Sequence, residues 1–215
     1  MSDHSFESMR RAMVASQLRT TAVNDARVVA AMREVPRERF VPAAQAAFAY
    51  TDRPVPLADG RSLNLPMATG RLLTATAPRP ADRALVVGAA SGYAAALLAR
   101  LVASVVALEE DAALPAIATA PPAENVTGAI GPLAEGWAAA GPYDLILVDG
   151  VVEAIPDALI DQLAPDGRLA AGLADRGVAR LVIGRKAGGG FGTAAFADVD
   201  GVPLPGFARP PVFSF

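Results

Sequence analysis

The chain has 215 residues, of which 53% are hydrophobic and 19% charged, and its formal net charge is −3. This composition can bury a core of its own, which excludes the intrinsically disordered and polar-linker classes. The acidic balance disfavours a nucleic-acid binder that depends on positive charge. With one histidine and no cysteine, zinc sites, iron–sulfur clusters, disulfide frameworks and cysteine or histidine nucleophiles are also disfavoured. We therefore expect any cofactor to be organic.

No apolar run in the sequence is long enough to cross a membrane, and the first ten residues lack the pattern of a signal peptide. We expect a cytoplasmic protein with neither a membrane nor a nucleic acid as partner. The length favours one compact unit with two parts. These are residues 1–80, with helices and a covering loop, and residues 81–215, with the main sheet.

Apolar residues recur at roughly helical intervals as far as residue 49, which predicts two or three helices. Asn24 or Asp25 offers an N-cap for the helix that Pro36 ends. Residues 50–80 hold prolines and glycines at positions 54, 56, 60, 66 and 70, too many for a long regular element. We expect an ordered loop with a function in this segment, since long structured loops usually have one.

From residue 83 onward, short apolar runs alternate with helical or connecting stretches. This alternation predicts an α/β fold with a doubly wound, mostly parallel sheet that is covered on both faces. Only residues 186–190 separate the last two runs, so we expect an antiparallel hairpin at that edge. The expected strands are 84–87, 104–108, 125–130, 145–148, 168–173, 179–185 and 191–199.

A turn with the sequence Gly88-Ala89-Ala90-Ser91-Gly92 follows the first strand and precedes an alanine-rich helix. The turn is neither the Gly-x-Gly-x-x-Gly dinucleotide fingerprint nor a P-loop, although an ordinary strand-to-helix corner could also look like this. Glu109 ends the next strand 21 positions after Gly88, a spacing typical of a carboxylate that binds a ribose. A nucleoside without phosphates fits these features, and S-adenosylmethionine is such a molecule.

Two other acidic residues follow strands. Glu110 stands beside Glu109, but a solvated side chain is its simpler explanation. Asp149 follows the run 145–148 and either faces the ligand cleft or caps a helix, and the sequence does not decide between the two. Trp137 and Phe191 have no basic neighbours at useful spacing, so we expect them to pack in the core or at an edge.

Longer motifs along most of the chain resemble the protein-L-isoaspartate (D-aspartate) O-methyltransferases, which are S-adenosylmethionine-dependent repair enzymes. The motifs occur in the order and spacing of that family at residues 13–18, 25–32, 35–42, 49–52, 91–99, 143–144, 155–159, 162–163, 167–168 and 202–204. The resemblance implies a Rossmann-like methyltransferase fold with an N-terminal helical extension. It also implies that the protein methylates the carboxyl group of L-isoaspartyl residues in damaged proteins or peptides.

The resemblance further implies a role for individual residues. Residues 88–92 correspond to the cofactor loop, Glu109 to the ribose acid, and Gly131-Pro132 to the adenine side. Ser62-Leu63-Asn64-Leu65-Pro66 corresponds to the family's Thr-Ile-Ser-x-Pro, so Asn64 takes the place of the catalytic serine. The cofactor contacts expected in this way are Ser62, Leu63, Thr69, Gly88, Ala89, Ala90, Ser91, Gly92, Glu109, Glu110, Gly131, Pro132 and Asp149.

The chain departs from the family pattern at Asn64, at Pro132 and at Ala89-Ala90. Methyl transfer to a carboxylate needs no general base, because the acceptor is already ionised at neutral pH, and positioning can supply most of the acceleration. Asn64 keeps an N–H donor that can orient a carboxylate, or else it caps a turn through its own backbone. Two alternatives stay open: another acceptor held by Asn64 and Asp149, or a binding protein that has kept the fold without the chemistry.

Overall fold

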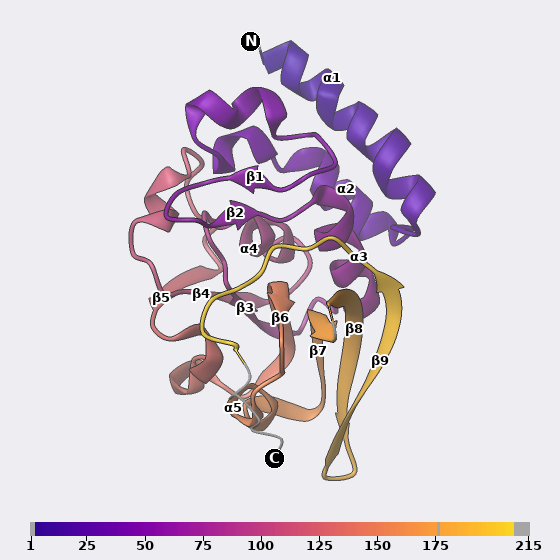
Figure 1. Cartoon of the computed structure of the whole chain (residues 1–215), viewed down its shortest axis with the longest axis vertical. Coiled ribbons are helices and arrows are strands. Elements are labelled where there is room, and N and C mark those ends of the chain that lie inside the picture. The colour runs from indigo at the N-terminus through magenta and orange to yellow at the C-terminus, as the bar shows by residue number, and fades with distance from the viewer. Residues whose placement is uncertain (1–2, 176, 209–215) are drawn as a thin grey trace.

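The structure is a computed structural model that describes residues 3–175 and 177–208. At its centre lies a seven-stranded sheet with the order β5-β4-β3-β6-β7-β8-β9 (Figure 1). Its strands are β3 (Arg83–Val87), β4 (Ser104–Glu109), β5 (Val126–Ile130), β6 (Tyr143–Val152), β7 (Leu163–Asp175), β8 (Val178–Ala187) and β9 (Gly190–Asp198). The predicted strands are therefore all present, with β6 and β7 longer than expected.

Strands β3 to β7 pair in parallel, whereas β8 is antiparallel to both of its neighbours. The mostly parallel sheet and its antiparallel edge are thus confirmed. The turn between β8 and β9 contains Gly188 and Gly189, which both have positive φ. Two consecutive residues with positive φ match the right-handed twist of a tight hairpin, and glycine adopts this conformation most easily.

The N-terminal segment is helical, as its apolar spacing predicts. Helix α1 (Asp3–Met13) continues into a π-helical turn and a 3₁₀ turn that end at Thr21, and α2 (Ala26–Glu34) follows. The Asp25 side chain accepts a hydrogen bond of 2.8 Å from the Arg27 N–H, which confirms the expected N-cap. Two short 3₁₀ helices, Arg37–Phe40 and Ala43–Phe48, complete the segment.

The expectation that residues 50–80 hold no long regular element is wrong. This segment contains helix α3 (Pro66–Thr76) and a small hairpin of β1 (Val55–Pro56) and β2 (Ser62–Leu63). Pro66 stands in the first turn of α3, where its missing N–H costs nothing. Gly70 lies inside α3, where a Cβ would come within 3.1 Å of Met32 and Val23 side chains. These two residues therefore start and pack a helix and do not break one.

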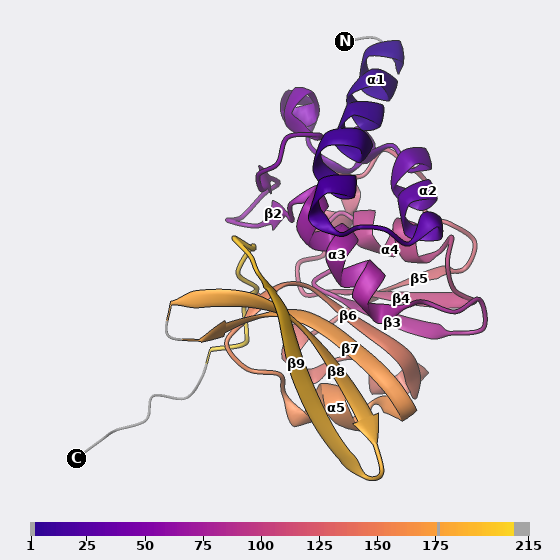
Figure 2. The ribbon, with the colours of Figure 1, turned by 90° about the vertical axis from the view of Figure 1, so that its right-hand side faces the viewer.

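The two faces of the sheet are covered unequally. Helices α1 to α3 and α4 (Tyr93–Leu98) lie on one side of the sheet, and the short α5 (Asp157–Asp161) lies on the other (Figure 2). The connection from β4 to β5 contains only the 3₁₀ turn Leu114–Ile117, because prolines at 115, 121 and 122 interrupt a longer helix. Two 3₁₀ turns, Leu133–Glu135 and Ala138–Ala140, connect β5 to β6.

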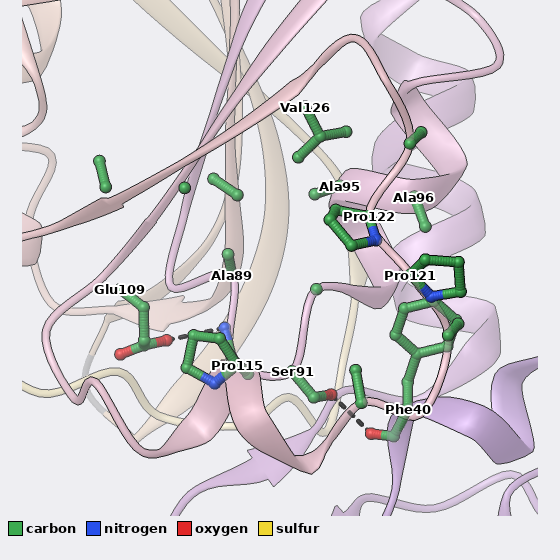
Figure 3. A pocket seen from close by; sticks show the side chains of 18 of the residues that line it. Phe40, Ala89, Ser91, Ala95, Ala96, Glu109, Pro115, Pro121, Pro122 and Val126 are labelled. Carbon is green, nitrogen blue, oxygen red and sulfur yellow. Dashed lines mark hydrogen bonds between the residues drawn. The ribbon is translucent and has the colours of Figure 1, made fainter.

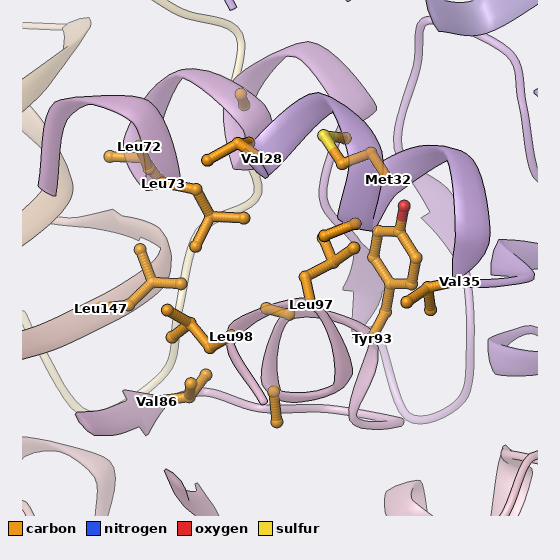
Figure 4. Close-up of a cluster of buried hydrophobic side chains, with 14 of the residues drawn as sticks. Val28, Met32, Val35, Leu72, Leu73, Val86, Tyr93, Leu97, Leu98 and Leu147 are labelled. Carbon is orange, nitrogen blue, oxygen red and sulfur yellow. The ribbon is translucent and has the colours of Figure 1, made fainter. Parts of the chain in front are cut away.

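Alternating residues of β3 enter two hydrophobic cores. Val86 faces a core that it shares with Leu147 and with the helices α2, α3 and α4 (Figure 4). Leu85 and Val87 face a second core on the other side of the sheet, together with α5 and the C-terminal segment 202–207. The N-terminal segment therefore shares one continuous core with the central strands.

Candidate active site

The turn after β3 lies against the end of β4. Gly88 and Gly92 have φ of +75° and +94°, in the region that favours glycine, and Ala90 between them has φ of +50°. The N–H groups of Gly88 and Ala89 both donate to the carbonyl of Leu108, at 3.1 and 3.0 Å. The strained turn is thus fixed to the carboxyl end of the neighbouring strand.

Glu109 faces this turn from the end of β4. Its side chain is buried, and its Oε2 accepts a hydrogen bond of 2.7 Å from the Ala90 N–H. Its carbonyl accepts a bond of 3.0 Å from the N–H of Gly131, on the expected adenine side. The prediction that residues 88–92 and Glu109 come together at one edge of the sheet is therefore confirmed.

Arg61 is a site residue that the sequence reasoning missed. Its Nη1 and Nη2 donate to Oε1 and Oε2 of Glu109 at 2.6 and 3.0 Å, and its side chain is almost buried. Arg61 ends the turn between β1 and β2, in which Asp59 and Gly60 have positive φ and the Arg61 N–H donates to the carbonyl of Ala58. The dipeptide Asp59-Gly60 is a strong hairpin signal and could have predicted this turn.

A cavity of about 450 Å³ opens beside the turn and Glu109 (Figure 3). It lies under the connection from β4 to β5, where a longer crossover helix is missing. Of the expected site residues, Ala89, Ala90, Ser91, Gly92 and Glu109 line it; the rest of its wall is mostly alanine and proline. An apolar cavity of this size with a few polar groups is typical of a small-molecule site.

A second polar cluster surrounds Asp149, which lies inside β6 beside the first turn of α3. Asp149 Oδ1 accepts hydrogen bonds from Asn64 Nδ2 at 3.3 Å and from Thr69 Oγ1 at 3.2 Å. Burial raises the pKa of the Asp149 carboxyl above its usual range, while the bond from Asn64 and the charge of Arg37 oppose this rise. The alternative that Asp149 caps a helix is wrong, because β6 continues to Val152.

The side-chain amide of Asn64 is held at both ends. Its Oδ1 accepts a bond of 3.0 Å from the Leu65 N–H, and its Nδ2 donates to Asp149. The buried guanidinium of Arg37 donates to the carbonyls of Asn64 and Ala49 and lies 4.7 Å from the centre of the Tyr93 ring. Asn64 therefore combines both expected uses of asparagine: a bond to its neighbouring backbone and a donor beside a carboxylate.

Other expected residues lie on β2, in the turn at 88–92 and next to Gly131 and Glu109. Ser62 and Leu63 form β2, and the Ser91 hydroxyl donates to the carbonyl of Phe40 at 2.5 Å. Pro132 is exposed and precedes a 3₁₀ turn. Glu110 is exposed and lines a cavity of about 460 Å³ that Arg61 also lines.

Trp137 and Phe191 are partly buried against the second hydrophobic core. Their placement agrees with the expectation that both are packing residues.

Among the residues that the structure describes, no helix is both long and apolar enough to span a membrane.

Comparison with known proteins decides the family. Residues 8–206 match the family model of protein-L-isoaspartate (D-aspartate) O-methyltransferases. The chain belongs to this family. It is 42% identical over 199 residues to a protein-L-isoaspartate O-methyltransferase of Methylorubrum extorquens, an alignment that covers 91% of this chain and 87% of the relative.

Solved structures of the family have the same fold. A protein-L-isoaspartate O-methyltransferase from Plasmodium falciparum, in complex with S-adenosyl-L-homocysteine, superposes with a TM-score of 0.78 at 21% identity. The match covers 93% of this chain and 97% of that one. A second protein-L-isoaspartate O-methyltransferase gives a TM-score of 0.77 at 22% identity, and the match covers 92% of this chain and 66% of that longer one. The methyltransferase fold expected from the sequence is thereby confirmed.

Proposed function

We propose that this protein transfers a methyl group from S-adenosylmethionine to the carboxyl group of L-isoaspartyl residues in damaged proteins or peptides. Membership of the family over residues 8–206 carries this proposal. The turn at 88–92, the buried carboxylate of Glu109 and the cavity that both line support it, because they suit a nucleoside without phosphates.

The residues present fit the cofactor in most positions. Glu109 would bind the ribose hydroxyls, residues 88–92 would hold the methionine part, and Gly131 would lie beside the adenine. Pro132 offers no carboxylate that could accept from an adenine amino group, and the loss of this hydrogen bond costs about 1 kcal/mol. The bound cofactor supplies the electrophilic methyl group on its sulfonium.

The remaining cluster suits an anionic acceptor. Asn64 carries an amide donor group that Leu65 and Asp149 hold in one orientation. Burial raises the pKa of the Asp149 carboxyl above its usual range, which works against a negative charge that would repel the acceptor carboxylate. We infer that Asn64 orients the acceptor carboxylate and that residues 1–80 cover the site.

The proposal is tested with the purified protein in two steps. Calorimetry with S-adenosyl-L-homocysteine measures cofactor-site binding, and methyl transfer is then measured on an isoaspartyl peptide and on the matched aspartyl peptide. We expect binding, and turnover of the isoaspartyl peptide alone. Binding without turnover would favour one of the two alternatives, another acceptor or a protein without the chemistry, whereas no binding would contradict the cofactor site itself.

We further propose that the protein works in the cytoplasm on protein or peptide substrates and does not bind nucleic acid. The lack of cysteine is compatible with a reducing compartment, and the net charge of −3 gives no attraction for polyanions. Salt-dependent binding to RNA or DNA in a filter assay would contradict the last point.

A further inference from the structure

All four acceptor positions of the Glu109 carboxylate are already used. Oε1 accepts from Arg61 Nη1 at 2.6 Å and from the Glu110 N–H at 2.9 Å. Oε2 accepts from Arg61 Nη2 at 3.0 Å and from the Ala90 N–H at 2.7 Å. An ionised carboxylate has about four lone-pair sites, so a further donor can bind only if one of these four leaves.

The two backbone donors belong to the turn and to the strand end, which the fold fixes in place. The Arg61 guanidinium, by contrast, stands at the end of a long side chain on a two-stranded hairpin, so it is the donor that can leave. The hydroxyls of a bound ribose would donate to Glu109. The ribose and the guanidinium of Arg61 therefore compete for the same two carboxylate oxygen atoms.

We propose that Arg61 sets the cofactor affinity of this protein: it binds Glu109 in competition with the ribose, and cofactor binding displaces it. This inference rests on the proposed function, because it takes a nucleoside cofactor as the ligand of Glu109. Arg61 is thus an affinity-determining residue of the site and not a group that contacts the reacting atoms.

The structure offers the displaced guanidinium a second position. A cavity of about 460 Å³ adjoins Arg61, and three residues with carboxylate side chains, Asp59, Glu110 and Asp111, contribute to its lining. Rotation of the Arg61 side chain into this cavity would keep its charge among acids and partly exposed to water. The displacement therefore exchanges one set of carboxylate partners for another and does not leave an unpaired buried cation.

The same movement would reach the acceptor cluster. Arg61 lies three residues before Asn64, and its charge acts on the Asp149 carboxyl. When Arg61 leaves Glu109, the hairpin that carries it is no longer bound to β4 through this ion pair. Cofactor binding would in this way alter the segment that presents Asn64 to the acceptor.

The experiment compares the affinity of S-adenosyl-L-homocysteine for the parent protein, Arg61→Gln and Arg61→Lys. Trp137 is the only tryptophan of the chain and lies against Gly131, so its fluorescence reports on the adenine side, and calorimetry gives the dissociation constant. We expect Arg61→Gln to bind about tenfold more tightly, since two charge-assisted hydrogen bonds no longer compete. Arg61→Lys keeps the charge but loses the bidentate geometry. Its affinity for S-adenosyl-L-homocysteine should lie between those of the parent protein and Arg61→Gln.

Arg168→Gln is the matched control. Arg168 forms the other buried arginine–carboxylate pair in the described part of the chain, with Asp82, at the opposite end of β3 from Gly88. Its loss should lower stability without tightening the binding of S-adenosyl-L-homocysteine. Circular dichroism at the temperature of the titration checks that each variant is folded. If Arg61→Gln does not fold, the affinity of Arg61→Lys for S-adenosyl-L-homocysteine tests the competition.

The outcomes separate the two proposals. Unchanged or weaker binding in both Arg61 variants, with binding to the parent protein intact, would overturn the competition and leave the proposed function standing. A crystal structure of the complex with Arg61 still on both oxygens of Glu109 would overturn it as well. If neither the parent protein nor the variants bind S-adenosyl-L-homocysteine, the proposed function fails, and this inference fails with it.

Discussion

Asn64 and Asp149 share a hydrogen bond, so a substitution at either residue also changes the surroundings of the other. We expect Asn64→Ser to keep or raise methyl transfer to an isoaspartyl peptide, because serine is the residue of the family pattern. Asn64→Leu should lower kcat/KM by about tenfold or more, since an oriented donor to a carboxylate is lost. Both variants should bind S-adenosyl-L-homocysteine almost as the parent protein does.

Thr69→Val is the control for this pair of variants. It removes the other donor to Asp149 Oδ1 but leaves Asn64 in place. If Thr69→Val lowers kcat/KM as much as Asn64→Leu, the effect acts through Asp149. If Asn64→Leu lowers only the thermal stability, Asn64 serves the turn through its bond to Leu65 and does not orient the acceptor.

Asp149 gives the protein a stability that depends on pH. Its pKa in the folded protein is above the ordinary value of 3.8, so the folded state holds this proton more tightly than the unfolded state does. Stability must then fall as the pH rises from below 3.8 through the folded-state pKa. Arg37 and Arg61 oppose this effect but do not reverse it.

We therefore expect Asp149→Asn to raise the melting temperature at pH 7. The asparagine Oδ1 can still accept from Asn64 and Thr69, and the cost of burying a charge disappears. The difference in melting temperature between Asp149→Asn and the parent protein should vanish near pH 3, where Asp149 is neutral. Melting curves between pH 3 and 8 test this, and a variant that is less stable than the parent at pH 7 would show that the charge of Asp149 stabilises the fold.

At the scale of elements, the C-terminal segment supports the cofactor turn. The Val151 N–H donates to the carbonyl of Val202 at 2.7 Å, and the Leu204 N–H donates to the carbonyl of Val151 at 2.9 Å. A Cβ on Gly88 or on Gly150 would lie 2.8 or 2.5 Å from Leu204 atoms. The side chain of Leu204 thus fills the space that both glycines leave.

We expect Leu204→Ala to lower the free energy of unfolding by about 2–4 kcal/mol, because it creates a cavity between the turn and β6. It should also weaken the binding of S-adenosyl-L-homocysteine, since the turn loses its support. Val178→Ala, at a half-exposed position of β8, is the control and should change stability by less than about 0.5 kcal/mol. Chemical denaturation measures the free energy of unfolding of both variants. An equally small effect of Leu204→Ala would contradict this role of the segment.

The sequence predicted those elements whose pattern is local. Apolar runs placed the strands of the large sheet, and Asp25 correctly marked the start of α2. Helix α3 was missed because Pro66 and Gly70 were interpreted as breakers, whereas Pro66 occupies the first turn and Gly70 permits close packing against α2. Whether a glycine breaks a helix or packs it depends on a neighbour that is distant in the sequence.

The site was predicted in the same uneven way. Glu109 and the turn followed from a spacing that the fold imposes, so they were found. Arg61 binds Glu109 across 48 positions of the sequence, and no periodicity reports such a pair. Whether Asp149 caps a helix also depended on how far β6 extends, which the run 145–148 did not show.

At the scale of the whole molecule, the N-terminal segment and the sheet share a core, whereas Trp137 packs against the other core. Leu72 of α3 is fully buried together with Val86 of β3 and Leu147 of β6. Trp137 packs on the opposite face of the sheet, with the second cluster. Because β3 and β6 contribute residues to both cores, we expect the described chain to unfold as one cooperative unit.

Leu72→Ala tests this cooperativity. The substitution should lower the free energy of unfolding by about 2–5 kcal/mol. The midpoint followed by Trp137 fluorescence should shift as far as the midpoint followed by far-UV circular dichroism, although Trp137 does not belong to the core that was changed. Leu159→Ala, in the second core, should move both midpoints together as well. A Trp137 midpoint that stays in place in Leu72→Ala while the circular dichroism midpoint falls would show that residues 1–80 unfold separately from the sheet.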